Sequence, residues 1–301
     1  MGPKGEVTSH LSGLFYRTME LLEKGIKPIY VYDGIPSKLK QRTIAARVAR
    51  REEARAEYEK AREEGDLVLM RSKAMASTRI NKEIVESSKK LLELMGVAYV
   101  MAPGEGEAQA SYMACSGLAY AAASQDYDTM LFGAPSVVRN LTFSGRRKLP
   151  RKNVYVNVVP EIMSLDGTLS SLGISRRQLI WIGILIGTDF NDGIEGIGPK
   201  TALKIAKGAS SIEEIEAYVA SKGKSFELDI REVEDLFERP EIKEMGPGDI
   251  TALTSQGCDA QGVVGFMCDI HGFSRERVEK FAAALDSGNR RSRQKGIDSW
   301  L

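Results

Sequence analysis

The chain has 301 residues, with 42 Lys and Arg against 41 Asp and Glu, 43% hydrophobic residues and only two histidines. This composition is that of a globular protein long enough for one large domain or two smaller ones. Three cysteines without C-x-x-C spacing argue against a disulfide framework or a zinc knuckle, and two histidines argue against a His-based triad or a His-rich metal centre. Any hydrolysis must therefore depend on carboxylates, metals, Lys or Arg, and no apolar stretch has the length of a membrane span.

The first part of the chain alternates predicted helices and short strands. Apolar residues at helical spacing predict a helix over Ser9–Gly25, with Ser9 as the N-cap and Gly25 at C′. A β-branched and aromatic run predicts a strand over Lys27–Gly34, which ends near Asp33. Three further elements are expected: a charged helix over 37–64, an amphipathic helix over 77–95 and a strand over 97–101.

Cations dominate the start of the charged helix. Such a run is usually a solvated helix face. Six cations without an anion, shortly after the carboxylate of Asp33, a candidate metal ligand, better suit a phosphate-bearing partner. Arg17 in the preceding helix leaves the same two readings open. The six cations before the first acid are Lys38, Lys40, Arg42, Arg47, Arg50 and Arg51.

Two acidic clusters follow in the middle of the chain. Glu105 and Glu107 come after a Pro-Gly turn and open an Ala-rich run, which predicts the first turn of a helix. Asp126 and Asp128 follow a short apolar run over Leu118–Ala123, which predicts a buried strand. Ligands of open α/β sheets bind at the carboxyl ends of strands, so both clusters are candidates for one site.

Carboxylates gathered at one sheet edge repel one another unless protons or cations hold them. Hard divalent cations such as Mg²⁺ or Mn²⁺ take oxygen ligands of this kind. Either cluster alone would be an ordinary acidic helix start or a solvated loop, but together they predict a metal site. Asp33 is a fifth candidate ligand at the same sheet edge, and Asp189 in Gly187-Thr188-Asp189 is a sixth.

The second half begins with predicted strands over 136–143 and 154–159, joined by a basic turn over 145–152, and an apolar helix capped by Ser175. The pattern G-I-G-P-K spans Gly196–Lys200. Its glycines permit a tight hairpin, and Pro199 suits the first position of a helix, whose free N–H groups bind anions beside Lys200. G-x-G alone is more often a plain turn, but G-I-G-P-K between apolar helices is the pattern of helix-hairpin-helix DNA-binding elements.

The C-terminal part is expected to be helical over 210–269 and again over 273–285. The segment 287–293 is small, polar and basic, which predicts a flexible tail. Nothing in such a tail can bury the terminal Trp300-Leu301, so these residues suggest a short peptide anchor for the pocket of a partner.

Taken in order, these motifs resemble the flap endonuclease family of structure-specific 5′ nucleases, in its archaeal and eukaryotic form. The resemblance implies an α/β fold with a mostly parallel central sheet flanked by helices. It further implies one nuclease domain over 1–286, with a helical arch over 37–95 and a helix-hairpin-helix region over 174–208, then a tail over 287–301. The matching motifs are Thr8–Leu11, Tyr16–Thr18, Val31–Gly34, both acidic clusters, Gly187–Asp189, G-I-G-P-K, Phe273–Arg277 and the last eight residues.

The resemblance also implies roles for individual residues. Lys40 and Arg47 match a catalytic basic pair on the arch that steers the 5′ strand. Two Mg²⁺ ions, for which Mn²⁺ substitutes, are expected at Asp33, Glu105, Glu107, Asp126, Asp128 and Asp189. DNA contacts are expected from Arg17, Glu105, Gly187, Asp189, Gly196, Gly198, Lys200 and Thr201, with K⁺ at the hairpin and a pocket for a one-nucleotide 3′ flap at Thr8 and Gly272–Phe273. Gln294, Ile297, Trp300 and Leu301 match a sliding-clamp-binding box over 294–301.

The expected function is cleavage of 5′ flaps on branched DNA during lagging-strand maturation and long-patch base excision repair, by a clamp-tethered cytoplasmic, nucleoid-associated monomer that does not bind membranes. Two departures from the family are visible. Asp33-Gly34-Ile35-Pro36-Ser37 replaces Asp-Gly-Lys-Pro-Pro, and residues 1–7 do not match the family's first core strand with its metal-binding Asp. We therefore expect an N-terminally truncated chain with lower stability and little cleavage. The alternatives are a non-catalytic DNA- and clamp-binding protein, or a related nuclease that acts on RNA, which the clamp box and the hairpin disfavour.

Overall fold

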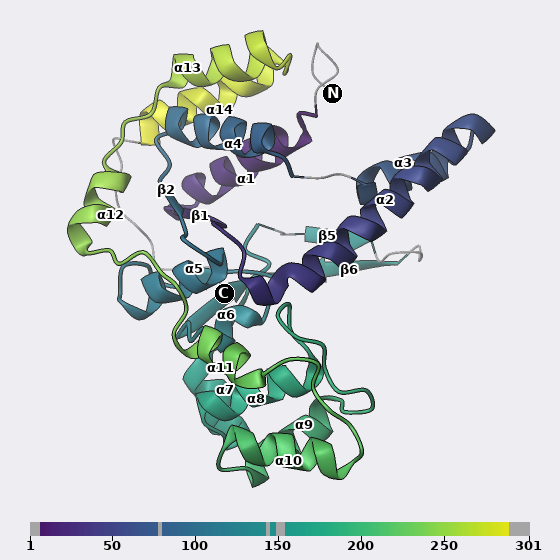
Figure 1. Cartoon of the computed structure of the whole chain (residues 1–301). Helices are drawn as coiled ribbons and strands as arrows, with labels where there is room; N and C mark the ends of the chain where they lie inside the picture. Colours follow the sequence, from purple (N-terminus) through teal and green to yellow (C-terminus); the bar gives the residue numbers. More distant parts are fainter. Residues whose placement is uncertain (1–6, 78–79, 143–144, 149–153, 289–301) are drawn as a thin grey trace. The chain divides into compact units, whose positions relative to one another are not determined.

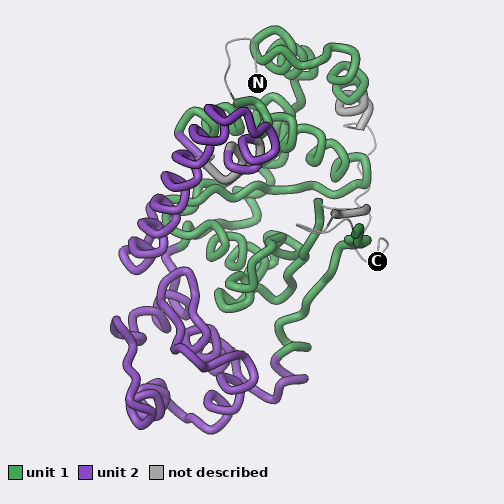
Figure 2. Tube along the Cα trace, turned by 90° about the vertical axis from the view of Figure 1, so that its right-hand side faces the viewer, with its two compact units in different colours: residues 1–34, 82–168, 242–301 green, residues 35–81, 169–241 purple. Residues whose placement is uncertain are grey.

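The computed structural model describes residues 7–77, 80–142, 145–148 and 154–288 (Figure 1). The chain divides into two compact units that alternate along the sequence (Figure 2). Unit 1 comprises residues 1–34, 82–168 and 242–301, and unit 2 comprises residues 35–81 and 169–241. Among the described residues, no helix is both long enough and apolar enough to cross a bilayer.

Unit 1 alternates short strands with helices. Its first half contains α1 (Ser9–Glu23), β1 (Tyr30–Tyr32), α4 (Lys82–Leu94), β2 (Tyr99–Met101), α5 (Gly106–Cys115), β3 (Ala122–Ala123) and α6 (Asp128–Leu131). The strands β4 (Ser136–Arg139), β5 (Gly145–Lys148), β6 (Tyr155–Val158) and β7 (Glu161–Ser164) follow, and α7 (Leu165–Leu172) begins in this unit. Unit 1 ends with α12 (Pro247–Thr254), α13 (Ala260–Val264), a π-helix (Gly265–Ile270) and α14 (Arg275–Gly288).

A helical core joins the N-terminal and C-terminal parts of unit 1. Leu11, Phe15 and Met19 recur every fourth residue on one face of α1, and all three are buried. They pack with Leu91 and Leu92 of α4 and with side chains of α13, the π-helix and α14. Burial of each such side chain contributes about 1.5–3 kcal/mol, so this cluster fixes α1 and α4 firmly within the unit.

The strands of unit 1 form small sheets whose first pairs are parallel. Strand β1 pairs with β2 from Tyr30↔Tyr99 to Tyr32↔Met101. Strand β3 pairs in parallel with β4, and β4 pairs antiparallel with β7. The expected α/β class is confirmed. The basic segment differs from the expectation of a turn over 145–152, because residues 145–148 form β5 and pair antiparallel with β6, while residues 149–153 lie outside the described residues.

Helix ends explain why several strands start later than the sequence predicts. Helices α1, α4 and α5 each end in a Schellman motif, in which the residue after a left-handed glycine donates its N–H to the carbonyl five residues earlier. These residues are therefore used in capping, and the strands expected from residues 97 and 118 begin only at Tyr99 and Ala122. The three glycines are Gly25, Gly96 and Gly117, with φ values of 81°, 66° and 68°.

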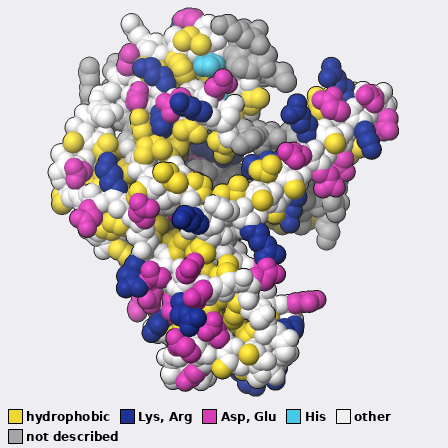
Figure 3. All heavy atoms as spheres, viewed as in Figure 1, with side chains coloured by type: hydrophobic (Ala, Val, Ile, Leu, Met, Phe, Trp, Pro, Cys, Tyr) yellow, Lys and Arg dark blue, Asp and Glu magenta, His cyan; other side chains and the backbone are white. Residues whose placement is uncertain are grey.

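Unit 2 begins with a helical hairpin (Figure 1). A 3₁₀ turn (Lys38–Lys40) leads into α2 (Gln41–Glu64), which ends at the left-handed Gly65, and α3 (Leu67–Ser77) runs back beside it. An ion pair between Lys73 and Glu57 joins the two helices. Figure 3 shows cationic and anionic side chains mixed along the outer part of this hairpin. The helix expected over 77–95 starts later, at Lys82.

The rest of unit 2 is helical. It contains α8 (Arg176–Ile186), α9 (Pro199–Gly208), α10 (Ile212–Ser221) and α11 (Ile230–Glu238). Ser175 caps α8 as predicted, in a capping box with Gln178, and Pro199 stands at the start of α9. Buried Ile180, Ile184 and Phe237 belong to its core.

Candidate metal centre

Glu107, Asp126 and Asp128 form an acidic cluster in unit 1. One carboxylate oxygen from each of the three residues lies within 4.8 Å of the other two. Glu107 stands in the first turn of α5, Asp126 lies in the loop after β3, and Asp128 opens α6. Oxygens this close fit a hard divalent cation, which binds oxygen ligands at about 2.0–2.6 Å. The structure thus brings together three of the six predicted metal ligands.

Two hydroxyl groups hold the Glu107 side chain. Ser124 donates a hydrogen bond to Glu107 Oε1, and Thr129 Oγ1 donates to the same oxygen at 3.2 Å. The Ser124 oxygen also accepts the N–H of Asp126 at 3.0 Å. Ser124 therefore connects α5 to the loop that carries the aspartates. Sequence reasoning missed both hydroxyl residues, and the only available signal was a Ser two positions before an Asp, which is typical of a side-chain-closed turn.

Asp33 lies beside the N-terminus of α5. Its Oδ1 accepts the N–H of Gly106 at 2.8 Å, and Gly34 N donates to Gly104 O at 2.7 Å. Because β1 and β2 are parallel, Asp33 and Glu105 follow strands that end at the same sheet edge. Glu105 is the N-cap of α5. Among the described residues, neither belongs to the cluster of three carboxylates within 4.8 Å.

Asp189 belongs to unit 2, where cations of the helical hairpin hold it. Arg47 Nη2 lies 2.7 Å from Asp189 Oδ1 and 2.9 Å from Oδ2, and Lys40 Nζ lies 3.4 Å from Oδ2. The Thr43 hydroxyl donates to the Asp189 carbonyl at 2.7 Å. The predicted catalytic cations and the sixth predicted ligand are therefore neighbours. Thr43 was missed because nothing in its sequence context distinguishes it.

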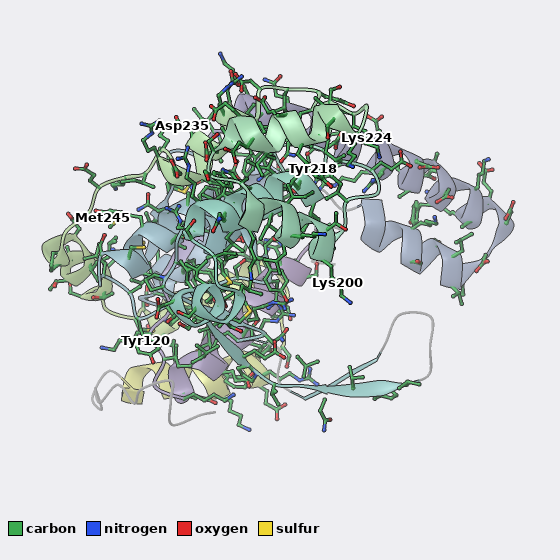
Figure 4. All side chains as sticks on the ribbon, turned by 90° about the horizontal axis from the view of Figure 1, so that it is seen from below. Tyr120, Lys200, Tyr218, Lys224, Asp235 and Met245 are labelled. Atoms are coloured by element: carbon green, nitrogen blue, oxygen red, sulfur yellow. The ribbon has the colours of Figure 1, made fainter. Side chains whose placement is uncertain are left out.

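The predicted DNA-binding hairpin lies between α8 and α9. Gly187 and Gly196 have φ values of 107° and 80°, which few residues other than glycine adopt. Gly198 is the N-cap of α9, and Lys200 and Thr201 in its first turn are exposed. Figure 4 labels Lys200 and also Lys224, a cation that the sequence analysis did not predict. Lys224 lies in the turn between α10 and α11, and its ammonium group donates a hydrogen bond to the Glu195 carbonyl.

Arg17 and the residues of the predicted 3′-flap pocket lie in or next to helices of unit 1. Arg17 is exposed on α1. Thr8 is buried at the start of α1, and Gly272, with a φ of 71°, precedes α14. The clamp box lies outside the described residues, namely Gln294, Ile297, Trp300 and Leu301.

The sequence matches the XPG N-terminal domain over residues 2–54 and the XPG I-region over residues 96–189. Flap endonuclease 1 of Pyrococcus furiosus is 44% identical over 302 residues, which cover 100% of this chain and 86% of the relative. Flap endonuclease 1 of Thermococcus onnurineus is 46% identical over 302 residues, which cover 100% of this chain and 85% of the relative. The chain belongs to the flap endonuclease family. This confirms the family identified from the sequence.

Solved structures agree with this assignment. Flap endonuclease-1 from Methanococcus jannaschii matches with a TM-score of 0.68 and 36% identity, over 96% of this chain and 85% of that one. The catalytic core of Rad2 in complex with DNA substrate has a TM-score of 0.66 at 22% identity, over 93% of this chain and 85% of that one, and shares the fold. As a member of the flap endonuclease family this protein is a nuclease, and its acidic cluster fits a metal site.

Proposed function

We propose that this nuclease cuts 5′ flaps on branched DNA by metal-dependent hydrolysis of a phosphodiester bond. The observation that carries the proposal is the cluster of Glu107, Asp126 and Asp128 in a chain at least 44% identical to two flap endonucleases. The Rad2 complex with a DNA substrate, a protein of the same fold, supports DNA as the substrate. The non-catalytic alternative is disfavoured because three carboxylates of the predicted metal site lie together.

The cluster would hold divalent cations, and Mg²⁺ is the proposed metal, with Mn²⁺ as a substitute. Bound metal supplies a Lewis acid for the phosphoryl oxygens and lowers the pKa of a coordinated water. Asp33, Glu105 and Asp189 are proposed to complete a set for two ions. Ser124 and Thr129 keep Glu107 Oε1 oriented, so that its carboxylate need not reorganise when a cation binds.

Lys40 and Arg47 are the proposed catalytic cations. Both belong to the start of the helical hairpin, and both contact Asp189 in this structure. Preorganised cations stabilise the charge that develops on a transferring phosphoryl group, so these side chains would act on the non-bridging oxygens. Arg47 is well suited because its planar guanidinium can bind two oxygens at once, as it does with Asp189.

DNA would be gripped away from the scissile bond by the hairpin Gly196–Thr201. Free N–H groups at the start of α9 and the exposed Lys200 form an anion site suited to a phosphate, with K⁺ proposed at the same hairpin. Arg17, Glu105, Gly187 and Asp189 are the other proposed contacts. Such contacts are independent of base sequence, as expected for a nuclease that recognises the shape of its substrate.

The cellular role follows from the proposed activity and from the C-terminal segment. We propose a monomer in the cytoplasm, associated with the nucleoid, that acts in lagging-strand maturation and long-patch repair. Residues 294–301 would tether it to the sliding clamp through Gln294, Ile297, Trp300 and Leu301. The observation behind the tether is the sequence of this segment, which ends in two large apolar residues.

The test is incubation of the full chain with a labelled double-flap DNA and Mg²⁺, followed by mapping of the product ends. Cleavage at the flap base that stops when EDTA removes the metal supports the proposal. Asp128→Asn should abolish cleavage but leave DNA affinity within about twofold, because a neutral amide is a poor ligand for a hard dication and loss of a negative charge does not weaken attraction to phosphate. Binding without cleavage by the wild type would support the non-catalytic alternative instead.

A further inference from the structure

Tyr127 is an exposed aromatic residue in the segment that carries two of the clustered carboxylates. It separates Asp126 from Asp128 in the chain, and 55% of its surface is accessible to solvent. The residues on either side carry two of the three clustered carboxylates. A tyrosine in this position buries little surface, so the core gives no reason for an aromatic side chain here.

Arg139 fixes the Tyr127 ring from one side. The Arg139 guanidinium carbon lies 4.4 Å from the ring centroid, and Nη1 donates a hydrogen bond to the tyrosine hydroxyl. Arg139 ends β4, whose backbone is paired with Glu161 of β7, so the guanidinium extends from a fixed strand. The Arg139 Nε–H is buried and has no hydrogen-bond partner. A buried unpaired N–H lowers the stability of the fold, and such a group calls for an explanation, which a functional role would provide.

These contacts satisfy the tyrosine hydroxyl and cover one face of the ring, while the residue as a whole stays 55% exposed. A cation against an aromatic ring contributes about 0.5–2 kcal/mol, and the added hydrogen bond restricts rotation of the side chain. The ring is therefore held in place against Arg139 before any ligand binds. A preorganised apolar surface loses less entropy on binding than a mobile one.

We propose that Tyr127 is a stacking platform for a nucleobase next to the scissile phosphate, and that Arg139 is the residue that positions it. The inference rests on the proposed function, because the substrate is taken to be a DNA strand whose phosphate lies at the metal centre. Every base has a π-face, so an aromatic ring binds bases without regard to sequence. Stacking at this point would hold the nucleotide whose phosphodiester bond is cut.

The first test compares kcat and KM of flap cleavage for substitutions of Tyr127. Tyr127→Ala should lower kcat/KM about tenfold, a typical effect of removing one base–aromatic contact. Tyr127→Phe keeps the ring and should stay within about threefold of the wild type. Arg139→Met should lower kcat/KM less than Tyr127→Ala, and Arg139→Lys should recover part of the loss. Tyr120→Ala is the matched control, because Tyr120 is 57% exposed but precedes β3 rather than following it, and it should behave as wild type.

The second test distinguishes stacking from a structural role. Substrates are made with an abasic nucleotide on either side of the scissile phosphate in turn. If Tyr127 stacks on one of these bases, the difference between wild type and Tyr127→Ala should vanish for that substrate and persist for the other. An equal loss on intact and abasic substrates would overturn the proposal, as would a Tyr127→Phe variant as slow as Tyr127→Ala.

A binding measurement keeps this inference separate from the proposed function. DNA with 2-aminopurine at either position is titrated with protein in Ca²⁺ instead of Mg²⁺. Stacking should quench the fluorescence with wild type and Tyr120→Ala but not with Tyr127→Ala. If the wild type cleaves no flap, the proposed function fails while this titration still decides whether Tyr127 stacks. Equal quenching by wild type and Tyr127→Ala would overturn the stacking role.

Discussion

The Ser124 hydroxyl acts on two parts of the metal centre at once, since it donates to Glu107 Oε1 and accepts from Asp126 N. Ser124→Ala should therefore loosen both the carboxylate of α5 and the aspartate loop. Loss of a residue that orients a metal ligand commonly weakens metal affinity about 10–100-fold. We expect the Mg²⁺ concentration for half-maximal cleavage to rise by about tenfold, with a parallel loss of Mn²⁺ affinity in direct binding measurements.

Ser170→Ala provides the control for this prediction, because Ser170 is exposed on α7 and donates no hydrogen bond to the cluster. It should leave the metal dependence unchanged. A Ser124→Ala variant with the Mg²⁺ and Mn²⁺ dependence of the wild type would show that Glu107 is oriented by its own helix instead.

At this scale the sequence predicts charged residues better than the groups that orient them. Glu107, Asp126 and Asp128 are identifiable because clustered carboxylates need a cation. Ser124 and Thr129 are not, because a hydroxyl near a turn usually serves the local backbone and has no distinctive spacing. Lys224 shows the same limit, since its contact with Glu195 joins residues that are 29 positions apart.

At the scale of elements, α8 and α11 are joined by a buried carboxylate. Glu234 is 6% exposed and accepts hydrogen bonds from Trp181 Nε1 at 2.6 Å and from Arg177 Nε at 2.7 Å. Its hydrogen bond is the main cause of the raised pKa of the Arg177 guanidinium. Glu234→Ala leaves the buried Trp181 N–H without a partner, so we expect the free energy of unfolding to fall by about 2–4 kcal/mol.

Urea unfolding followed by circular dichroism measures this change. Glu238→Ala is the control, because Glu238 lies 3.7 Å from the half-exposed Arg177 and pairs of this kind contribute less than about 1 kcal/mol. Equal destabilisation by the two variants would mean that the buried hydrogen bonds of Glu234 add nothing specific.

The pairing of α1 with α4 predicts a pH dependence. His10 Nε2 lies 2.8 Å from Ser87 Oγ, and its pKa is lowered, first by burial and then by the charge of His271. A His with a lowered pKa in the folded state takes up its proton more readily when unfolded. Its contribution to stability is therefore complete above the unfolded pKa of about 6.5 and is lost as the pH falls toward the folded value.

The measurement is the urea-unfolding free energy of wild type and His10→Gln at pH 7.5 and pH 5.5. Wild type should lose more stability than the variant over this interval, because glutamine does not titrate. Identical losses would mean that protonation of His10 is no harder in the folded chain than in the unfolded one.

Element types were predicted more reliably than element boundaries. The capping box of Ser175 and the start of α9 at Pro199 follow local rules that involve only three or four neighbouring residues. The strand expected from residue 118 fails at its start because Leu118 caps α5, which an apolar run does not reveal. Residues 145–148 form a strand because of pairing with β6, and a basic composition suggested only a turn.

At the scale of the whole molecule, the C-terminal segment predicts a separable function. Deleting residues 294–301 removes Trp300 and Leu301, and aromatic anchors of such peptides commonly contribute about 2 kcal/mol or more. The deletion should abolish stimulation of cleavage by the sliding clamp while basal cleavage stays within about twofold. Cleavage assays with and without the clamp decide this, and equal stimulation of the full and shortened chains would exclude the tether.

Two glycines near the proposed active residues allow no side chain at all. A Cβ on Gly34 would lie 2.1 Å from the Ala102 carbonyl oxygen, and one on Gly193 would lie 1.9 Å from that of Ile186. Both obstacles are backbone atoms, which cannot rotate away. Any relative with the same backbone at these two positions must therefore have glycine at both, whatever its substrate or growth temperature. Backbone geometry alone excludes other amino acids at Gly34 and Gly193, so neither glycine needs to contact DNA to be invariant.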